Sequence, residues 1–436
     1  MTSLLLSPFP GPRMTAENPA DTPPAEVPAP PANRARFLGD EKTFWRLLRR
    51  GAVLLLVTLG IYRFWLATDV RRSLWNHTEI AGDYLEYIGT ARELLLGFLI
   101  AIVLLVPINI VLFLTTLSSG LLGQVAGALT LVVLGLLGQF AVYRARRYRL
   151  TRTLYRGIRF HQTGAAWRYA ICAIFWWAMI GLTLGLAYPW AQASLERFKL
   201  HNTHYGDLQG EFVGSGTRLF FRGVLLWIVV VGPFVLGLVL AIGNVDWDAL
   251  AEASRRGGDD IMSRVEGVAP ALAVAALSFA WSLIAIALLY PAFQAMVLRW
   301  WISGLRFGAL TVTSRLSTRA VYRLYGRFAW LALLAAAVLG IAVFIGLAII
   351  GALESWLGKG TLTELLQTAI LIGTYVVVAL AYSTIYQATV KLRLWQQGFQ
   401  SIELAGTEVL DGVKATGAGG SAVGEGLADA LNVGGI

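Results

Sequence analysis

Six long apolar segments are the strongest constraint on the fold of this chain, because about 20 mainly apolar residues can cross a bilayer as a helix. Hydrophobic residues make up 56% of the chain and charged residues only 14%, whereas soluble domains carry about 25% charged residues. The sequence therefore predicts an all-α fold class, a polytopic transmembrane helical bundle. The six segments are about 94–116, 121–143, 221–243, 269–293, 328–351 and 364–389.

Two further segments, 47–67 and 169–190, leave the number of spans open between six and eight. If all eight segments cross and the N-terminus is cytoplasmic, the Arg-rich loop 144–168 lies outside. If these two segments instead enter the membrane and return, most of the 36 Lys and Arg residues lie on the cytoplasmic side, as the positive-inside rule requires. Hydropathy favours the first arrangement and charge the second. In both, the N- and C-termini are expected in the cytoplasm.

An internal repeat links the two uncertain segments. "LGIYRFWLATDVRRSLWNHTEIAGD" at 59–83 returns as "LGLAYPWAQASLERFKLHNTHYGD" at 184–207, with a degenerate copy at 290–299 and a trace at 382–395. Each good copy begins like the end of a membrane helix and continues with the Trp and Arg residues of an interfacial helix. Alternating residues around Gly-Asp then indicate a β-hairpin. The bundle is thus expected to contain internal repeats, with short interfacial helices and β-hairpins between the spans.

Composition predicts three regions. Residues 1–45 are Pro-rich and are expected to form a disordered N-terminal tail. Residues 46–400 form the multi-spanning membrane domain, and residues 401–436 form a Gly- and Ala-rich flexible tail. Within the membrane domain the repeats are expected near 51–160 and 169–308, with a degenerate third near 328–400.

Several of these motifs together resemble the YjgN-like family of uncharacterised bacterial inner-membrane proteins. The resemblance runs from about 51 to 400, and its clearest parts are "TLGIYRFW", "TRTLYRGIRF" and "EFVGSGTRLF". The degenerate copy departs from the pattern, since Ala292 stands where Trp is expected. The resemblance implies a multi-pass protein of the bacterial inner (plasma) membrane. It implies no reaction and no substrate.

Two groups of polar residues are candidate binding residues. The first group could bind an anionic lipid or solute, because Arg favours bidentate contacts to phosphate; it comprises Arg159, Arg197, Lys199, His201 and Arg306. The second group is polar within the apolar segments, where burial in lipid is costly; it comprises Gln124, Ser278 and Ser282. His201, His204 and Asp207 are also close in sequence, but a polar interfacial loop explains them better than a metal site, so we expect no metal and no cofactor.

The motifs of common enzymes do not occur. The sequence has no HExxH, GxxxxGK[ST] or GxSxG motif, so we expect the protein not to be an enzyme. The net charge of +10 fits Lys and Arg facing the cytoplasm, and no recognition motif indicates nucleic acid. The expected partners are the lipid bilayer and anionic phospholipid headgroups. A transporter or channel-like protein for a small or amphiphilic solute is the leading hypothesis, and a non-transporting lipid-binding or envelope-organising scaffold is the alternative. The solute and the oligomeric state stay open.

Overall fold

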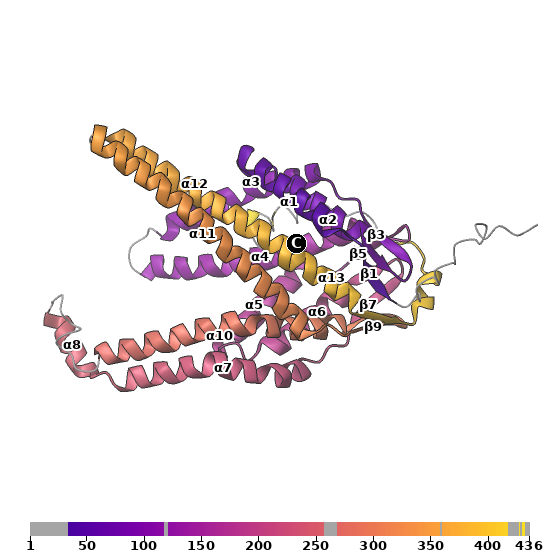
Figure 1. Ribbon diagram of the computed structural model, residues 1–436. Coiled ribbons are helices and arrows are strands. Elements are labelled where there is room, and N and C mark those ends of the chain that lie inside the picture. The colour runs from indigo at the N-terminus through magenta and orange to yellow at the C-terminus, as the bar shows by residue number, and fades with distance from the viewer. Residues whose placement is uncertain are drawn as a thin grey trace, which may run out of the picture. The chain divides into compact units, whose positions relative to one another are not determined.

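Alternating apolar and polar residues form short strands at several places along the chain, and each place directly follows or precedes a helix (Figure 1). The computed structural model describes residues 34–116, 121–256, 268–357, 360–416, 427, 430 and 431. Its strands are β1 (Ala35–Phe37), β2 (Thr78–Ile80), β3 (Asp83–Tyr87), β4 (Thr153–Tyr155), β5 (Ile158–Gln162), β6 (Thr203–Tyr205), β7 (Leu208–Phe212), β8 (Leu305–Phe307), β9 (Leu310–Ser314) and β10 (Ile402–Ala405).

All ten strands belong to one antiparallel sheet in which each strand pairs with its neighbour in sequence. Four hairpins have two-residue turns, and glycine supplies the positive φ that such turns need, as at Gly82 and Gly157. The remaining two strands, β1 and β10, come from the two ends of the chain. A bridge between Arg34 and Glu403 brings them next to each other. The sheet is therefore a nearly closed barrel. We call the end with the two-residue turns the turn end and the opposite end the helix end.

The all-α fold class predicted from the sequence is therefore wrong. The sequence predicts the hairpins between the spans, but as separate ribbons. A two-stranded ribbon leaves N–H and C=O groups unpaired along both edges and is marginally stable alone. Here each edge pairs with the next hairpin, for example Leu85 with Tyr155 and Phe160 with Tyr205. The result is a mixed fold of long helices attached to one sheet.

The described helices follow one another along the chain, and most of them meet the sheet at its helix end. They are α1 (Glu41–Val57), α2 (Arg63–Asn76), α3 (Ala91–Thr116), α4 (Leu121–Thr151), α5 (Ala166–Leu182), α6 (Tyr188–His201), α7 (Gly216–Gly243), α8 (Trp247–Arg256), α10 (Val268–Ile302), α11 (Thr318–Leu357), α12 (Thr361–Tyr386), the π-helix η1 (Gln387–Lys391), α13 (Leu392–Gln400) and the 3₁₀ helix η2 (Thr407–Gly412).

Among the described residues, six helices are long and apolar enough to cross a membrane. They run over Ala91–Thr115, Val125–Thr151, Gly216–Gly243, Val268–Ile302, Thr318–Trp356 and Thr361–Gln400. They match the six strongest segments of the sequence and form the antiparallel pairs α3–α4, α7–α10 and α11–α12. At most 22% of the most apolar window of any of these helices is buried within the protein, so most of their apolar surface faces outward.

The two uncertain segments each form a short helical hairpin. The helix stops at Val57 or Leu182, and the next residues Leu59-Gly60 and Leu184-Gly185 have positive φ. The chain then returns, as the contact of Tyr169 on α5 with Phe198 on α6 shows. This agrees with the enter-and-return arrangement. In the degenerate copies the helix instead continues, through Pro291 in α10 and through η1 between α12 and α13.

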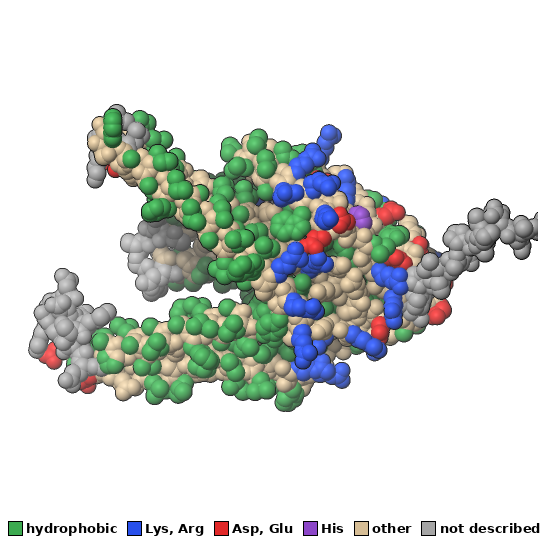
Figure 2. All heavy atoms as spheres, viewed as in Figure 1, with side chains coloured by type: hydrophobic (Ala, Val, Ile, Leu, Met, Phe, Trp, Pro, Cys, Tyr) green, Lys and Arg blue, Asp and Glu red, His purple; other side chains and the backbone are tan. Residues whose placement is uncertain are grey.

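A band of Lys and Arg side chains lies between the apolar helices and the sheet (Figure 2). It contains arginines from the sheet-proximal ends of several helices, and we call this set the basic belt: Arg92, Arg144, Arg149, Arg168, Arg218, Arg222, Arg319, Arg323 and Arg327. Beyond the belt, the apolar part of α7 after Arg222 is about 30 Å long at about 1.5 Å per residue. That length matches the hydrocarbon core of a bilayer.

The segments at the two ends of the chain take part in the sheet. Strand β1 and the first residues of α1 lie within the region assigned to the N-terminal tail, and β10 and η2 lie within the region assigned to the C-terminal tail. Residues 1–33 and most residues after 416 are outside the described residues.

Candidate ligand cavity

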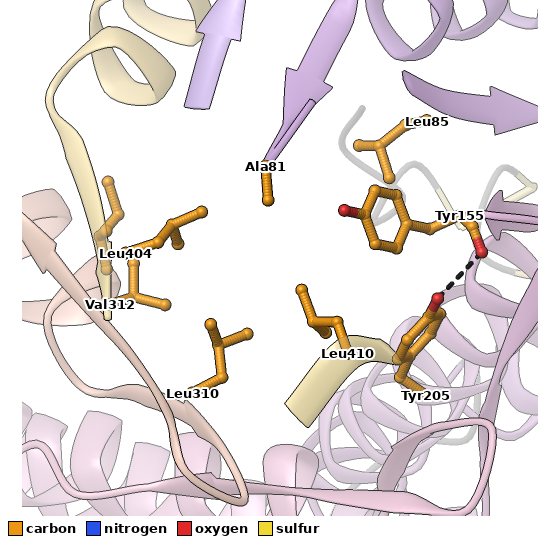
Figure 3. Packing of buried hydrophobic residues seen from close by; sticks show 9 residues of the cluster. Ala81, Leu85, Tyr155, Tyr205, Leu310, Val312, Leu404 and Leu410 are labelled. Carbon is orange, nitrogen blue, oxygen red and sulfur yellow. Dashed lines mark hydrogen bonds between the residues drawn. The ribbon is translucent and has the colours of Figure 1, made fainter. Parts of the chain in front are cut away.

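The inward side of the barrel is apolar. Side chains alternate along each strand, and those facing the lumen converge on a common space (Figure 3). Tyr155, Tyr205 and Val312 are among them, and each is at most 9% exposed. The outward positions are polar, as at Glu211, which pairs with Arg306 on the next strand. Polar side chains outside and apolar ones inside indicate a barrel that stands in water with an apolar interior.

The turn end of the barrel is covered by the segment after β10. Leu410 on η2 is buried among the lumen side chains. Asp411 accepts a bond of 2.7 Å from Arg156 in the β4–β5 turn. Asp207 in the β6–β7 turn exchanges backbone and side-chain hydrogen bonds of 3.1 and 3.0 Å with Lys414. These contacts hold the segment across two hairpins, so the lumen is closed at this end.

The lumen forms a cavity of about 580 Å³, which is lined from Leu410 at the turn end to Lys391 at the helix end. Its wall comes from the strands and from α1, α2, α10, α12, η1, α13 and η2, and consists almost wholly of aliphatic and aromatic side chains. Small-molecule sites in proteins are typically apolar cavities of about 300–1,000 Å³ with a few polar groups. The size and lining therefore fit an apolar or amphiphilic ligand.

The polar groups of the cavity lie together at its helix end. Gln294 on α10 and Lys391 on η1 line the cavity. The Gln294 amide oxygen accepts a hydrogen bond from the Tyr325 hydroxyl. The Lys391 ammonium lies 6.0 Å from the ring centre of Tyr386, which also lines the cavity. This polar cluster is situated at a π-helix, a local irregularity that is frequent at functional sites.

The two lumen tyrosines keep their protons. Burial raises the pKa of Tyr205 to about 12 and also raises the pKa of Tyr155. Tyr205 donates a hydrogen bond of 3.0 Å to the Tyr155 carbonyl, and Tyr155 donates one of 2.8 Å to the Ile80 carbonyl. Both hydroxyls are therefore used in the barrel wall, and neither offers a base or a nucleophile to a ligand.

Comparison with known families gives one result. Residues 32–430 match a family described as a bacterial protein of unknown function, DUF898. The chain belongs to this family. It is the same family as the YjgN-like one, so the resemblance found in the sequence is confirmed. No curated protein matches the chain, and no solved structure matches it either.

In this DUF898 protein the candidate residues of the 184–207 copy hold the fold together. Arg197 donates to the Gly214 carbonyl at 3.2 Å, and Arg72 makes the same bond of 3.0 Å to Gly89 in the first copy. Lys199 forms an ion pair with the buried Glu196. Burial lowers the pKa of Lys199, and the attraction of Glu196 opposes that shift.

The histidines of "HNTH" separate in the structure. The His201 carbonyl accepts a hydrogen bond of 2.6 Å from the Gln209 amide. His204 instead stacks on His161 of the neighbouring strand, with ring centres 4.9 Å apart. Burial and the nearby His204 lower the pKa of His161. Within the described ranges no three His, Cys, Asp or Glu side chains are arranged to hold a metal ion.

The structure does not bring the remaining anion candidates together. Arg159 lies on β5 and pairs with Leu154, while Arg306 lies on β8 opposite Glu211. Strands β6 and β7 lie between them. Both arginines are on the polar outer face of the barrel and do not line the cavity.

The described polar candidates inside the spans, Ser278 and Ser282, donate hydrogen bonds to backbone carbonyl groups. Pro233 cannot supply the N–H that would bond the Val229 carbonyl within α7. Trp281 on α10 donates to that carbonyl at 3.1 Å, and Ser282 donates to the Val230 carbonyl at 2.8 Å. Ser278 packs against Gly237, where a Cβ would come within 2.4 Å of it. Gln124 belongs to α4, but its side chain is outside the described part of the chain.

Sequence reasoning misses the cavity and its polar cluster. The signal for Lys391 is a single lysine in "YQATVKLRLW", which the sequence pattern explains only as a trace of the repeat. The signal for the lumen is the alternation in "TLYRGIRF", where Tyr155 and Phe160 point inward. Neither pattern reveals a cavity by itself, because the wall is assembled from segments far apart in the chain, such as those of Ala35 and Leu404.

Proposed function

We propose that this protein is an integral inner-membrane protein that binds an amphiphilic solute in the barrel cavity and passes it between the bilayer and the cavity, as a transporter. The cavity carries the proposal: it is apolar, it is closed at the turn end by η2, and residues of α10, η1 and α13 line its other end. A solute would thus enter from the membrane side. The chain acts by binding and not by catalysis, with the bilayer as its partner and without nucleic acid.

The basic belt supports a cytoplasmic position for the barrel. Lys and Arg accumulate at the cytoplasmic ends of spans, and the belt lies where six spans meet the sheet. Labelling with a membrane-impermeant maleimide tests this orientation in cells that produce the Cys172→Ser chain. Gln209→Cys, on the outside of the barrel, should react only after permeabilisation, whereas Ser355→Cys, at the far end of α11, should react in intact spheroplasts. The reverse pattern would exclude a cytoplasmic barrel.

Binding is tested with the full chain in phosphatidylcholine nanodiscs and a photoactivatable sixteen-carbon alcohol. Val312 faces the lumen and is 9% exposed, so Val312→Trp should fill part of the cavity and reduce labelling of β9. The matched variant Thr313→Trp places the same ring on the outer face of the same strand and should label like the wild type. Equal labelling of the two variants would exclude the lumen as the site.

A lipid-binding, envelope-organising scaffold is the second candidate. The observation that favours it is the low burial of the spans, 0–22% of each apolar window, which leaves wide apolar surfaces for lipid or further chains. The belt arginines would then bind anionic phospholipid headgroups. Transfer of the photoactivatable alcohol between donor and acceptor vesicles separates the candidates. Faster transfer by wild type than by Val312→Trp supports the transporter, and identical rates support the scaffold.

A further inference from the structure

Lys391 is a cation at the polar end of an otherwise apolar cavity. It ends the π-helix η1, and its ammonium lies over the ring of Tyr386. Among the residues that the structure describes, no carboxylate forms an ion pair with it. The neighbouring cations Arg393 and Arg327 both pair with Glu41. A cation in apolar surroundings without a counter-charge is costly, so this position favours an anion supplied from outside the chain.

The groups around Lys391 are arranged to donate hydrogen bonds. The oxygen of Gln294 is occupied by the Tyr325 hydroxyl, which leaves the Gln294 amide N–H₂ as a donor. Gln294, Tyr386 and Lys391 line the same cavity, and the Lys391 ammonium lies over the Tyr386 ring. An ammonium and an amide N–H₂ together suit the oxygens of a carboxylate or a phosphate.

Apolar burial alone cannot select a ligand from a membrane. Lipid tails are about as apolar as the leucines of the cavity, so an alkyl chain gains little by moving from the bilayer into the lumen. Selectivity must come from the head of the ligand. The wall offers a polar cluster with a positive charge at the helix end and an apolar lumen that ends at Leu410.

We propose that the ligand is a single-chain amphiphile with an anionic head, whose carboxylate or phosphate binds Lys391 and Gln294 and whose alkyl chain fills the barrel. This inference rests on the proposed function, because it names the class of solute that the cavity takes. Lys391 is the residue that distinguishes an anionic head from a neutral one. The alkyl chain of the ligand lies in the lumen along Val312 and Leu404.

The test is competition against the photoactivatable sixteen-carbon alcohol in the same nanodiscs, with hexadecanoate, hexadecyl phosphate and hexadecanol as competitors. A hydrogen-bonded ion pair inside a protein changes affinity by about tenfold to a hundredfold. For the wild type, at least one of the two anions should therefore compete about tenfold or more better than hexadecanol. The better of the two identifies the head as carboxylate or phosphate.

Two lysine variants complete the test. Lys391→Met should lose the preference for the anion while the neutral probe still labels β9, which also shows that the barrel is folded. Lys391→Arg should keep the preference, and Lys414→Met, an exposed lysine at the turn end, should behave like the wild type. Equal competition by anions and alcohol in the wild type, or an undiminished preference in Lys391→Met, overturns this inference and leaves the proposed function standing. Absence of lumen labelling by the neutral probe overturns the proposed function itself.

Discussion

Two equivalent threonines should differ in their contribution to stability. Thr78 and Thr203 each begin a strand and each donate a hydrogen bond of 2.7 Å to the carbonyl four residues earlier, at the end of the preceding helix. They are 0% and 2% exposed. Thr78 also accepts a bond of 3.0 Å from the indole of Trp395 on α13, and this bond links the first hairpin to the last helix.

The magnitude follows from the bonds lost when each threonine is replaced by valine, which has nearly the same shape. Thr203→Val removes one hydrogen bond, with a net cost of about 1 kcal/mol. Thr78→Val removes the equivalent bond and also leaves the Trp395 N–H without an acceptor, which adds about 1–3 kcal/mol. We therefore expect the free energy of unfolding to fall by about 2–4 kcal/mol in Thr78→Val.

Hydrogen exchange of the β9 amides measures both variants with the same reporter, since β9 (Leu310–Ser314) contains neither threonine. Each 1.4 kcal/mol changes protection about tenfold, so protection should fall about fivefold in Thr203→Val and about 30-fold or more in Thr78→Val. In a Trp395→Phe background the indole donor is gone, and Thr78→Val should then cost only about as much as Thr203→Val. Equal losses in the two single variants would refute the reasoning.

Three further outcomes are expected. Gly185→Ala should lower the free energy of unfolding by about 1–2 kcal/mol, because Gly185 has φ +94° and an alanine is strained there. Gly181→Ala lies in a helix with open space around the new methyl group, so it should not lower this free energy. Thermal unfolding of the purified chain checks both variants, and equal effects would contradict a strained turn. Ser282→Ala should destabilise the α7–α10 pair by about 1 kcal/mol, because it removes the hydrogen bond to the Val230 carbonyl. Ser278→Ala should cost less, because Ser278 donates only within its own helix. A larger loss for Ser278→Ala in the same assay would argue against the hydrogen bond between the two helices. The pKa of His161 is lowered in the fold, so the unfolded chain binds a proton on this side chain at a higher pH than the folded chain does. The free energy of unfolding should therefore be constant above about pH 6.5 and fall below it. If the melting temperature of His161→Gln declines between about pH 7 and pH 5 as much as that of the wild type, the decline belongs to other groups.

The sequence alone determined the membrane-spanning character, the family and the repeat. Hydropathy over about 20 residues is a local property, so the order of the amino acids is enough to locate all six spans. The glycines of "TLG" likewise indicate the joints at Gly60 and Gly185, because positive φ favours glycine. The hairpins are recognisable from their turns and from the alternation of side chains. For the site, the sequence supplied basic and polar residues, but Arg197 and Ser282 bond backbone carbonyls of the fold itself.

Only the tertiary structure decided that the hairpins form one sheet and enclose a cavity. Each hairpin has the same sequence pattern whether its edges are free or paired, because the partner strand belongs to another part of the chain. The contact between β1 and β10 is the extreme case, since Arg34 and Glu403 meet from opposite ends of the chain. Lys391 shows the consequence for function: in the sequence it is one lysine near the end of a span, and in the fold it is the cation of an apolar cavity. Strand pairing over such distances depends on the whole chain, and so does the site that it builds.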